Sequence, residues 1–381
     1  MGKIYKAMGL MSGTSLDGVD VSIIESDGNT EFSPILDRYF EYDEELIQKI
    51  LNIREKITNP EKLNTYLSEI EDLERKITLF NVEAIKETLR TSKSSVDLIG
   101  FHGQTIFHDS EKKITKQLGD GNLLSQLTKK KVIYNFRQND LENGGQGAPL
   151  TPIFHNILAN KINKKFNIGF PLNILNIGGI SNITSTVSWE NLENINKIYA
   201  YDIGPGNCLI DEWIRKNSKK RYDKDGLIAS SGITDKLILN QALENFTENS
   251  NYEKSLDVKD FDIFFAKGLS LENGASTVTN FTATLIANGM NYAHKMSHPR
   301  MCKWLVCGGG RKNKYLLESI KKNFRQISIE PIDQYEIDGD FVESQAFGYL
   351  AIRSFLKLPI SFPSTTGCKE PTIGGELIKN F

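Results

Sequence analysis

The sequence predicts an α/β protein built from two similar lobes. Its 381 residues exceed the length at which a single hydrophobic core usually stops growing. In both halves of the chain, short apolar strands run into glycine-bearing turns, and segments with helical spacing of apolar residues lie between these units. Length and pattern together therefore favour two α/β lobes with a crevice between them.

The first half opens with a strand, a polar turn and a second strand. Residues 4–11 are apolar, residues 12–18 have turn chemistry, and residues 19–25 alternate apolar with polar side chains. In residues 43–91 the apolar side chains recur at helical spacing, which predicts amphipathic helices. Residues 96–101 then predict another buried strand.

The second half repeats this arrangement. A strand, a glycine turn and a following element recur in residues 172–184, 197–214 and 304–320, with Asp202 where the second of these strands is predicted to end. The repetition predicts an internal duplication of one α/β lobe. We expect the first lobe to comprise residues 1–135 and 350–381, and the second to comprise residues 136–349.

Composition excludes several classes of function. The chain has 46 basic and 48 acidic side chains, without the basic excess that nucleic acid requires. No stretch approaches the ~20 apolar residues that span a bilayer, and the N-terminus has no secretory segment, so we expect a cytoplasmic protein without a membrane partner. The four cysteines and five histidines lack CxxC and HExxH spacing, so carboxylates and phosphates would hold any metal.

Four glycine-bearing turns predict phosphate binding. Anion recognition needs backbone N–H groups that no Cβ shields, and glycine with small hydroxyl residues provides them. The turns are residues 13–18, 178–179, 204–206 and 308–310. One such turn is typical of an ordinary hairpin, but four favour a nucleotide. The chain has neither GxxxxGK[ST] nor a GxGxxG after a strand, which argues against a Walker loop and a dinucleotide enzyme.

Aspartates accompany two of these turns. Asp17 and Asp20 lie in the first hairpin, and Asp202 precedes the third turn. A carboxylate at a strand end can orient magnesium or accept a proton from an attacking oxygen. It can equally cap the amides of its own turn. The residues alone leave both roles open.

The motifs, taken in order, resemble the anhydro-N-acetylmuramic acid kinase family. The similar segments cover nearly the whole chain and are residues 9–20 (GLMSGTSLDGVD), 102–105 (HGQT), 119–120, 136–137, 144–150, 176–182 (NIGGISN), 202–207 (DIGPGN) and 307–310. The resemblance implies a two-lobed actin-like ATPase fold, which is ribonuclease H-like, with a central nucleotide cleft. It also implies ATP-dependent phosphorylation of 1,6-anhydro-N-acetylmuramic acid, with water opening the anhydro ring to give N-acetylmuramic acid 6-phosphate.

The same resemblance implies the site residues. Asp202 matches the catalytic aspartate, which would deprotonate the water that attacks the anomeric carbon. The nucleotide contacts are Gly13, Thr14, Ser15, Leu16, Asp17, Gly18, Val19, Asp20, Gly178, Gly179, Gly204, Gly206, Asn207, Gly308, Gly309 and Gly310. The sugar contacts are His102, Gln104, Thr105, Arg137, Asp202 and Glu343, and the planar fork of an arginine suits the lactyl carboxylate. ATP and magnesium are the implied cofactors, an amino sugar is the implied partner, and a homodimer acting in peptidoglycan recycling is the implied assembly.

Two other classes of function share part of this residue set. A chaperone-like or filament-forming actin-like ATPase would keep the ATP-binding turns but would not need His102, Gln104, Arg137 and Glu343. A glycoside hydrolase that used two carboxylates would not need four phosphate-type turns. The sequence therefore favours the sugar kinase.

Overall fold

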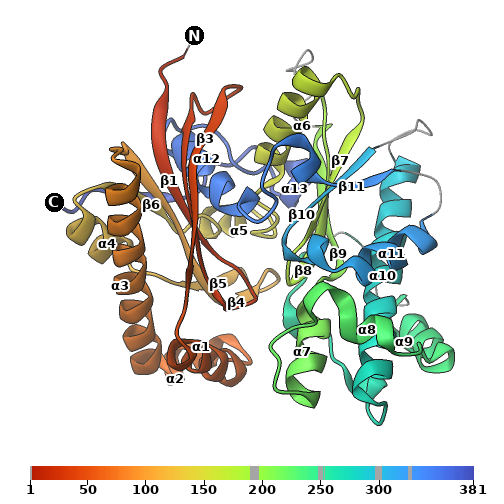
Figure 1. Ribbon diagram of the computed structural model, residues 1–381. Coiled ribbons are helices and arrows are strands. Elements are labelled where there is room, and N and C mark those ends of the chain that lie inside the picture. Colours follow the sequence, from red (N-terminus) through yellow and green to blue (C-terminus); the bar gives the residue numbers. More distant parts are fainter. Residues whose placement is uncertain (1, 189–196, 248–251, 253, 297–302, 325–327) are drawn as a thin grey trace. The chain divides into compact units, whose positions relative to one another are not determined.

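Two mixed β-sheets, each in its own α/β unit, organise the computed structural model (Figure 1). The structure describes residues 2–188, 197–247, 252, 254–296, 303–324 and 328–381. The first unit is Met1–Ile157 with Phe341–Phe381, and the second is Leu158–Asp340. This division differs from the expected lobe boundaries, because residues 136–157 and 341–349 have their contacts in the first unit.

The first unit contains a seven-stranded sheet of order β12-β6-β4-β1-β2-β3, to which β5 is added beside β4. Its elements are β1 (Tyr5–Ser12), β2 (Gly18–Ser26), β3 (Phe32–Glu41), α1 (Glu44–Lys56), α2 (Pro60–Thr65), α3 (Leu67–Ser92), β4 (Leu98–Asp109), β5 (Ile114–Leu118), α4 (Gly121–Thr128), β6 (Lys131–Tyr134), α5 (Gln138–Glu142), the start of α6 (Pro152–Phe166), α12 (Val342–Phe355), α13 (Pro363–Thr366) and β12 (Glu376–Ile378). The predicted first hairpin and the helices of residues 43–91 are confirmed.

The second unit contains a five-stranded sheet of order β11-β10-β7-β8-β9. Its elements after α6 are β7 (Leu172–Ile177), β8 (Ile180–Ser185), β9 (Tyr199–Pro205), α7 (Cys208–Asn217), η2 (Lys224–Gly226), α8 (Leu227–Ser231), α9 (Lys236–Thr247), η3 (Val258–Asp260), η4 (Phe264–Ala266), α10 (Leu271–Met296), β10 (Lys303–Cys307), η5 (Gly309–Lys312), α11 (Lys314–Asn323), β11 (Ile329–Pro331) and η6 (Ile332–Tyr335).

Five strands of the first sheet have the same order and direction as the five strands of the second. The first three strands of each form an antiparallel meander, β1-β2-β3 and β7-β8-β9. A parallel strand then pairs with the first strand of each meander, β4 with β1 and β10 with β7. A second parallel strand pairs with that one, β6 with β4 and β11 with β10. Short turns suffice for the antiparallel pairs, whereas the parallel strands need the helical crossovers that the chain supplies. This repeated ribonuclease H-like arrangement confirms the predicted fold class and the predicted repetition.

Helices cover both faces of the first sheet. Apolar residues of α1 and α3 share a core with Met8 and Leu10 of β1. The opposite face carries Gly9 and Gly100, against which α12 packs. A Cβ at Gly9 would lie 1.9 Å from the carbonyl oxygen of Ser344, so only glycine permits this close approach of helix and sheet. The close packing explains why residues 341–349 belong to the first unit.

The core of the second unit lies between its sheet and helices α7, α10 and α11. Its largest buried side chains come from both layers and include Trp213 of α7 and Trp304 of β10. Trp213 also donates from its indole nitrogen to the carbonyl oxygen of Leu271 at 2.9 Å, which satisfies its polar atom inside the core. Among the residues that the structure describes, no helix combines the length and apolar character needed to cross a membrane.

The buried imidazole of His155 predicts that the protein loses stability in acid. His155 of α6 is fully buried, and burial lowers its pKa from 6.5 to about 3. Below pH 6.5 the unfolded chain therefore binds a proton that the folded chain does not. The contribution of His155 is fully present above that pH, and about 2 kcal/mol of it is lost by about pH 5.

Thermal unfolding at about pH 7.5 and about pH 5 checks this prediction. The midpoint of the wild-type protein should fall more steeply with acid than that of a His155→Leu variant, which has no imidazole to protonate in the unfolded state. Equal losses in the two proteins would contradict it.

Candidate active site

The first predicted phosphate turn joins β1 to β2 and is held by hydrogen bonds to its carbonyl groups. The carbonyl oxygen of Gly13 accepts from the backbone N–H of Leu16 at 3.3 Å and from Nε2 of Gln104 at 3.0 Å. The carbonyl oxygen of Thr14 accepts from Nη1 of Arg54, in α1, at 3.3 Å. Leu16 buries its side chain although its φ is 60°, a left-handed value that closes the turn.

The carboxylates of this turn have different surroundings. Asp17 is exposed, and its Oδ1 accepts from the hydroxyl of Ser15 at 2.6 Å, whereas Asp20 is half-buried in β2. Behind them the hydroxyls of Ser12 and Tyr42 share a hydrogen bond of 2.8 Å. Burial, together with the two nearby carboxylates, raises the pKa of Tyr42. Its phenol therefore stays protonated and available for this bond.

His102 and Arg137, both predicted sugar contacts, lie together in the first unit. Nε and Nη2 of Arg137 lie 3.1 and 2.9 Å from Nε2 of His102, and Nη1 donates to the carbonyl oxygen of Gly147 at 2.7 Å. Nδ1 of His102 lies 2.8 Å from the carbonyl oxygen of Gly103, so Nδ1 carries the proton and Nε2 accepts. Burial and the guanidinium of Arg137 hold the pKa of His102 well below its usual value. The pair is thus a neutral imidazole that orients a cation.

Glu343 lies one helical turn before Phe347, a residue whose ring contacts that of His102. The ring of Phe347, in α12, lies 4.5 Å from that of His102 between centroids. Residues four apart occupy the same face of a helix, so Glu343 is on the face of α12 that is turned toward His102. Thr105, the remaining predicted sugar contact of β4, is half-buried and accepts from Nε2 of Gln117 at 3.3 Å.

In the second unit, two glycine turns contact each other directly. The carbonyl oxygen of Gly178 accepts from the N–H of Asn207 at 2.8 Å, and that of Gly179 accepts from the N–H groups of Gly206 and Cys208 at 2.8 and 3.2 Å. A Cβ on Gly206 would lie 2.2 Å from the carbonyl oxygen of Gly178. Glycine is therefore required for this contact, which joins the β7–β8 turn to the start of α7.

Asp202 lies inside β9, not at the end of a strand as the sequence pattern predicted. The strand continues to Pro205 because β8 pairs with it through a bulge: Ser181 lies opposite Gly204 and Asn182 lies opposite Asp202, which leaves one extra residue on β9. Asp202 is 6% exposed, and its Oδ2 accepts from the N–H of Leu256 at 2.9 Å.

A row of polar side chains crosses the second sheet at the level of this aspartate. Asn182 pairs with Asp202 on one side and with Asn176 on the other, and Asn176 pairs with Cys307 of β10. Directly paired residues point to the same face, with Cβ atoms about 5 Å apart. Oδ1 of Asn182 is buried with no hydrogen-bond partner in the described part of the chain. Asn182 is thus a further candidate site residue. It lies in the NIGGISN motif of residues 176–182 but was not among the predicted site residues.

The turn of residues 308–310 is held by Arg311. Nη1 of Arg311 donates to the carbonyl oxygen of Gly308 at 3.1 Å, and its Nε and Nη2 form a bidentate pair with Asp333 at 2.7 and 2.8 Å. Asp340 accepts from Nη1 at 2.5 Å. Burial alone would lower the pKa of Arg311, but these carboxylates raise it, so the cation is permanent. Arg311 follows the motif immediately, yet no residue pattern marked it.

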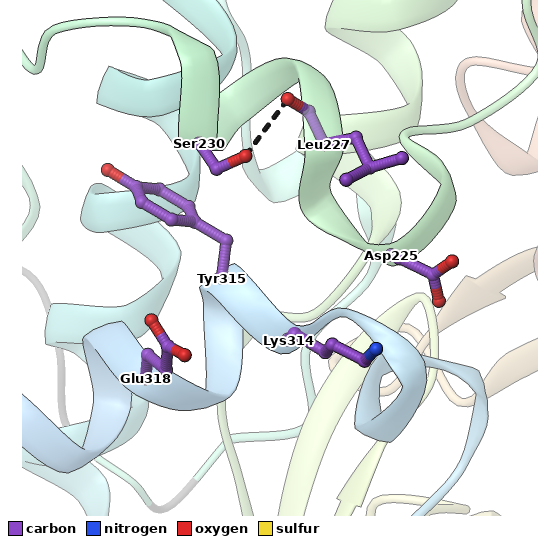
Figure 2. Close-up of a pocket in the computed structure, with 6 residues that line it drawn as sticks. All are labelled: Asp225, Leu227, Ser230, Lys314, Tyr315 and Glu318. Atoms are coloured by element: carbon purple, nitrogen blue, oxygen red, sulfur yellow. Dashed lines mark hydrogen bonds between the residues drawn. The ribbon is translucent and has the colours of Figure 1, made fainter.

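A pocket of about 210 Å³ lies at the start of α11, the helix that follows this turn in the chain. Figure 2 shows Tyr315 of α11 turned toward Ser230 of α8. The phenol oxygen of Tyr315 lies 2.8 Å from the hydroxyl of Ser276. A Cβ added to Gly226 would lie 2.7 Å from the Cβ of Tyr315, so this position requires glycine. The lining residues are Asp225, Leu227, Ser230, Lys314, Tyr315 and Glu318.

The structure thus brings predicted residues together within each unit. In the first, His102 contacts Arg137 directly and Gln104 contacts the turn of residues 13–18. In the second, the turns of residues 178–179 and 204–206 contact each other beside Asp202.

Comparison with known proteins identifies the family. The family model described as anhydro-N-acetylmuramic acid kinase matches residues 5–380. The chain belongs to this kinase family. A relative named anhydro-N-acetylmuramic acid kinase, from Pelagibacter ubique, is 52% identical over 383 residues and covers 100% of both chains. Relatives of the same name from Agrobacterium fabrum and Zymomonas mobilis are 37% and 36% identical, and the matches cover 100% and 97% of this chain and 100% and 99% of theirs. The resemblance to the anhydro-N-acetylmuramic acid kinase family is therefore confirmed.

Proposed function

We propose that the chain uses ATP to phosphorylate 1,6-anhydro-N-acetylmuramic acid while water opens the anhydro ring, which gives N-acetylmuramic acid 6-phosphate. The observation that carries this proposal is the full-length match to the family, with 52% identity to one relative. The same full-length match disfavours a chaperone-like or filament-forming ATPase. The product is a cell-wall sugar, so we propose a cytoplasmic role in peptidoglycan recycling, as a homodimer.

ATP binding is assigned to the glycine turns of each unit. In the first unit the peptides of residues 13–18 would contact the phosphates, and in the second the turns of residues 178–179 and 204–207 would do so. Carbonyl groups at Gly13, Gly178 and Gly179 are already engaged by the protein, which suits turns that present N–H groups to an anion. The nucleotide cleft itself remains a prediction.

The adenosine moiety is assigned to the second unit. The turn of residues 308–310 leads directly into α11, whose first residues line the pocket of Figure 2. An aromatic ring at Tyr315 offers a surface on which a purine base stacks. The pocket supports the predicted approach of this turn to the adenosine side.

Magnesium fits the donor set on one condition, that the phosphates supply most of its ligands. Among the described residues no group of three or more His, Cys, Asp or Glu is arranged to hold a metal ion. Mg²⁺ with nucleotides needs only one or two carboxylates, since it keeps its other positions for phosphates and water. Asp20, in the first hairpin of the first unit, is the carboxylate that we propose for it. When bound, the ion would neutralise charge on the phosphates.

Asp202 is proposed as the general base. Its carboxylate would take a proton from water as the water oxygen bonds to the anomeric carbon, and the bond from that carbon to O6 breaks. O6 then bonds to the γ-phosphorus as the bond from that phosphorus to ADP breaks. Oδ2 of Asp202 accepts from the backbone N–H of Leu256 at 2.9 Å, which orients the carboxylate that would take the proton.

The sugar side is assigned to the first unit. Arg137 would bind the lactyl carboxylate with its guanidinium, whose plane is fixed by His102 and by the carbonyl oxygen of Gly147. Thr105 and Glu343 are the proposed contacts to sugar hydroxyls. Gln104 belongs to the predicted set too, but its amide nitrogen donates to the first phosphate turn.

A coupled assay of ATP consumption across a panel of anhydro and ordinary amino sugars tests this function. We expect turnover with 1,6-anhydro-N-acetylmuramic acid, and a product whose mass exceeds that of the substrate by one HPO₃ and one H₂O. Turnover restricted to ordinary sugars, with a gain of HPO₃ alone, would contradict hydrolytic ring opening. ATP hydrolysis that no sugar stimulates would favour the ATPase alternative.

A further inference from the structure

We propose that Gln104 and Arg54 are positioning residues for the first phosphate turn, and that they act by binding two consecutive carbonyl groups. The inference rests on the proposed function, in which the turn binds the phosphates of ATP. It departs from the sequence expectation for Gln104, which placed this side chain on the sugar. Arg54 lies outside every motif of the chain.

Gln104 contacts the turn from the neighbouring strand β4. Its side chain is fully buried in β4, and its Nε2 donates to the carbonyl oxygen of Gly13, 91 residues earlier, at 3.0 Å. The strands place it there, since Ser12 of β1 is paired with Gln104 in the parallel register. The donating amide nitrogen of Gln104 is a rigid support for the peptide group of Gly13.

Arg54 acts on the next peptide. It lies in the last turn of α1, and its Nη1 donates to the carbonyl oxygen of Thr14 at 3.3 Å. The side chain is half-buried. A cation at this position also places positive charge behind a turn that would hold a triphosphate.

Binding these two carbonyl oxygens sets the direction of the amides. The cis peptide bonds of the described chain are Ala148–Pro149 and Phe170–Pro171, so the peptides of the turn are trans. In a trans peptide the C=O and the following N–H point in opposite directions. With Gly13 and Thr14 held by their oxygens, the N–H groups of Thr14 and Ser15 are directed away from β4 and α1. Consecutive N–H groups so directed form an anion-binding concavity.

The second unit reaches the same arrangement by other means. There the oxygens of Gly178 and Gly179 are held by backbone N–H groups at the start of α7. The corresponding turn of the first unit has two side chains in that place, so removing them should affect one turn and leave the other intact. This asymmetry makes the proposal testable by substitution.

The test is a pair of full-length variants, Gln104→Met and Arg54→Met, which keep side-chain volume but remove the donors. We expect each to raise the KM for ATP about tenfold, as the loss of one hydrogen bond to an ordered binding turn implies, while the KM for the anhydro sugar stays within about twofold. Arg54→Lys, which restores a donor and the charge, should recover most of the ATP affinity. Calorimetric titration with ADP provides an activity-independent readout of the same change.

Gln48→Met and Arg75→Met, at exposed positions of α1 and α3, are the matched controls and should leave both constants unchanged. A rise in the KM for the sugar with an unchanged KM for ATP would overturn the proposal and return Gln104 to the sugar side. Unchanged constants and ADP affinity in both variants would overturn it as well. Failure of the proposed function is distinct, because the wild-type protein would then show no turnover with the anhydro sugar.

Discussion

Asp202→Asn should reduce kcat for the anhydro sugar by about 10³-fold, within the range that loss of a general base causes. An asparagine cannot take the proton of the attacking water at neutral pH. Its carbonyl oxygen can still accept from the N–H of Leu256, as the carboxylate does at 2.9 Å, so the local structure should persist. The affinity for ADP, measured by calorimetric titration, should change less than about twofold.

Asp72→Asn is the matched control for this experiment. Asp72 is an exposed residue of α3 that pairs with Lys76 four residues later, and its replacement should not alter kcat. An Asp202→Asn enzyme with the full wild-type rate would remove Asp202 from its assigned role. A variant that lost ADP affinity as strongly as rate would indicate a role in holding the nucleotide instead.

Arg137→Ala should raise the KM for the sugar by about 10- to 100-fold, which corresponds to the loss of a hydrogen-bonded charge pair. The guanidinium is already oriented by His102 and by the carbonyl oxygen of Gly147, so little of its freedom would be lost on binding a carboxylate. The KM for ATP should stay within about twofold of the wild-type value.

Arg137→Lys separates charge from geometry at the same position. A lysine keeps the positive charge, but its ammonium group has no planar fork with which to contact His102, Gly147 and a carboxylate together. Only part of the sugar affinity should therefore return. Thermal unfolding of both variants controls for the loss of the internal bonds. An unchanged KM for the sugar in Arg137→Ala would exclude this residue from the sugar site.

Local sequence patterns were reliable guides to the elements and to the family. Residues 172–177 read as a strand and are β7, and residues 13–18 and 178–179 read as turns and lie between strands. Each of these depends on neighbouring residues alone: apolar runs favour strands, and glycine favours turns. The element expected after the turn of residues 308–310 is helix α11, which begins at Lys314 because Asn313 caps it by accepting from the N–H of Leu316.

The sequence by itself determined the α/β class, the repeated glycine turns, the family and the identity of Asp202 as the residue to test. The tertiary structure alone decided which groups hold those turns and what stands beside that aspartate. Gln104 meets Gly13 across 91 residues, and a one-residue bulge sets Asn182 opposite Asp202. Hydrogen-bond partners and strand register follow from long-range pairing and packing, which no short stretch of sequence encodes.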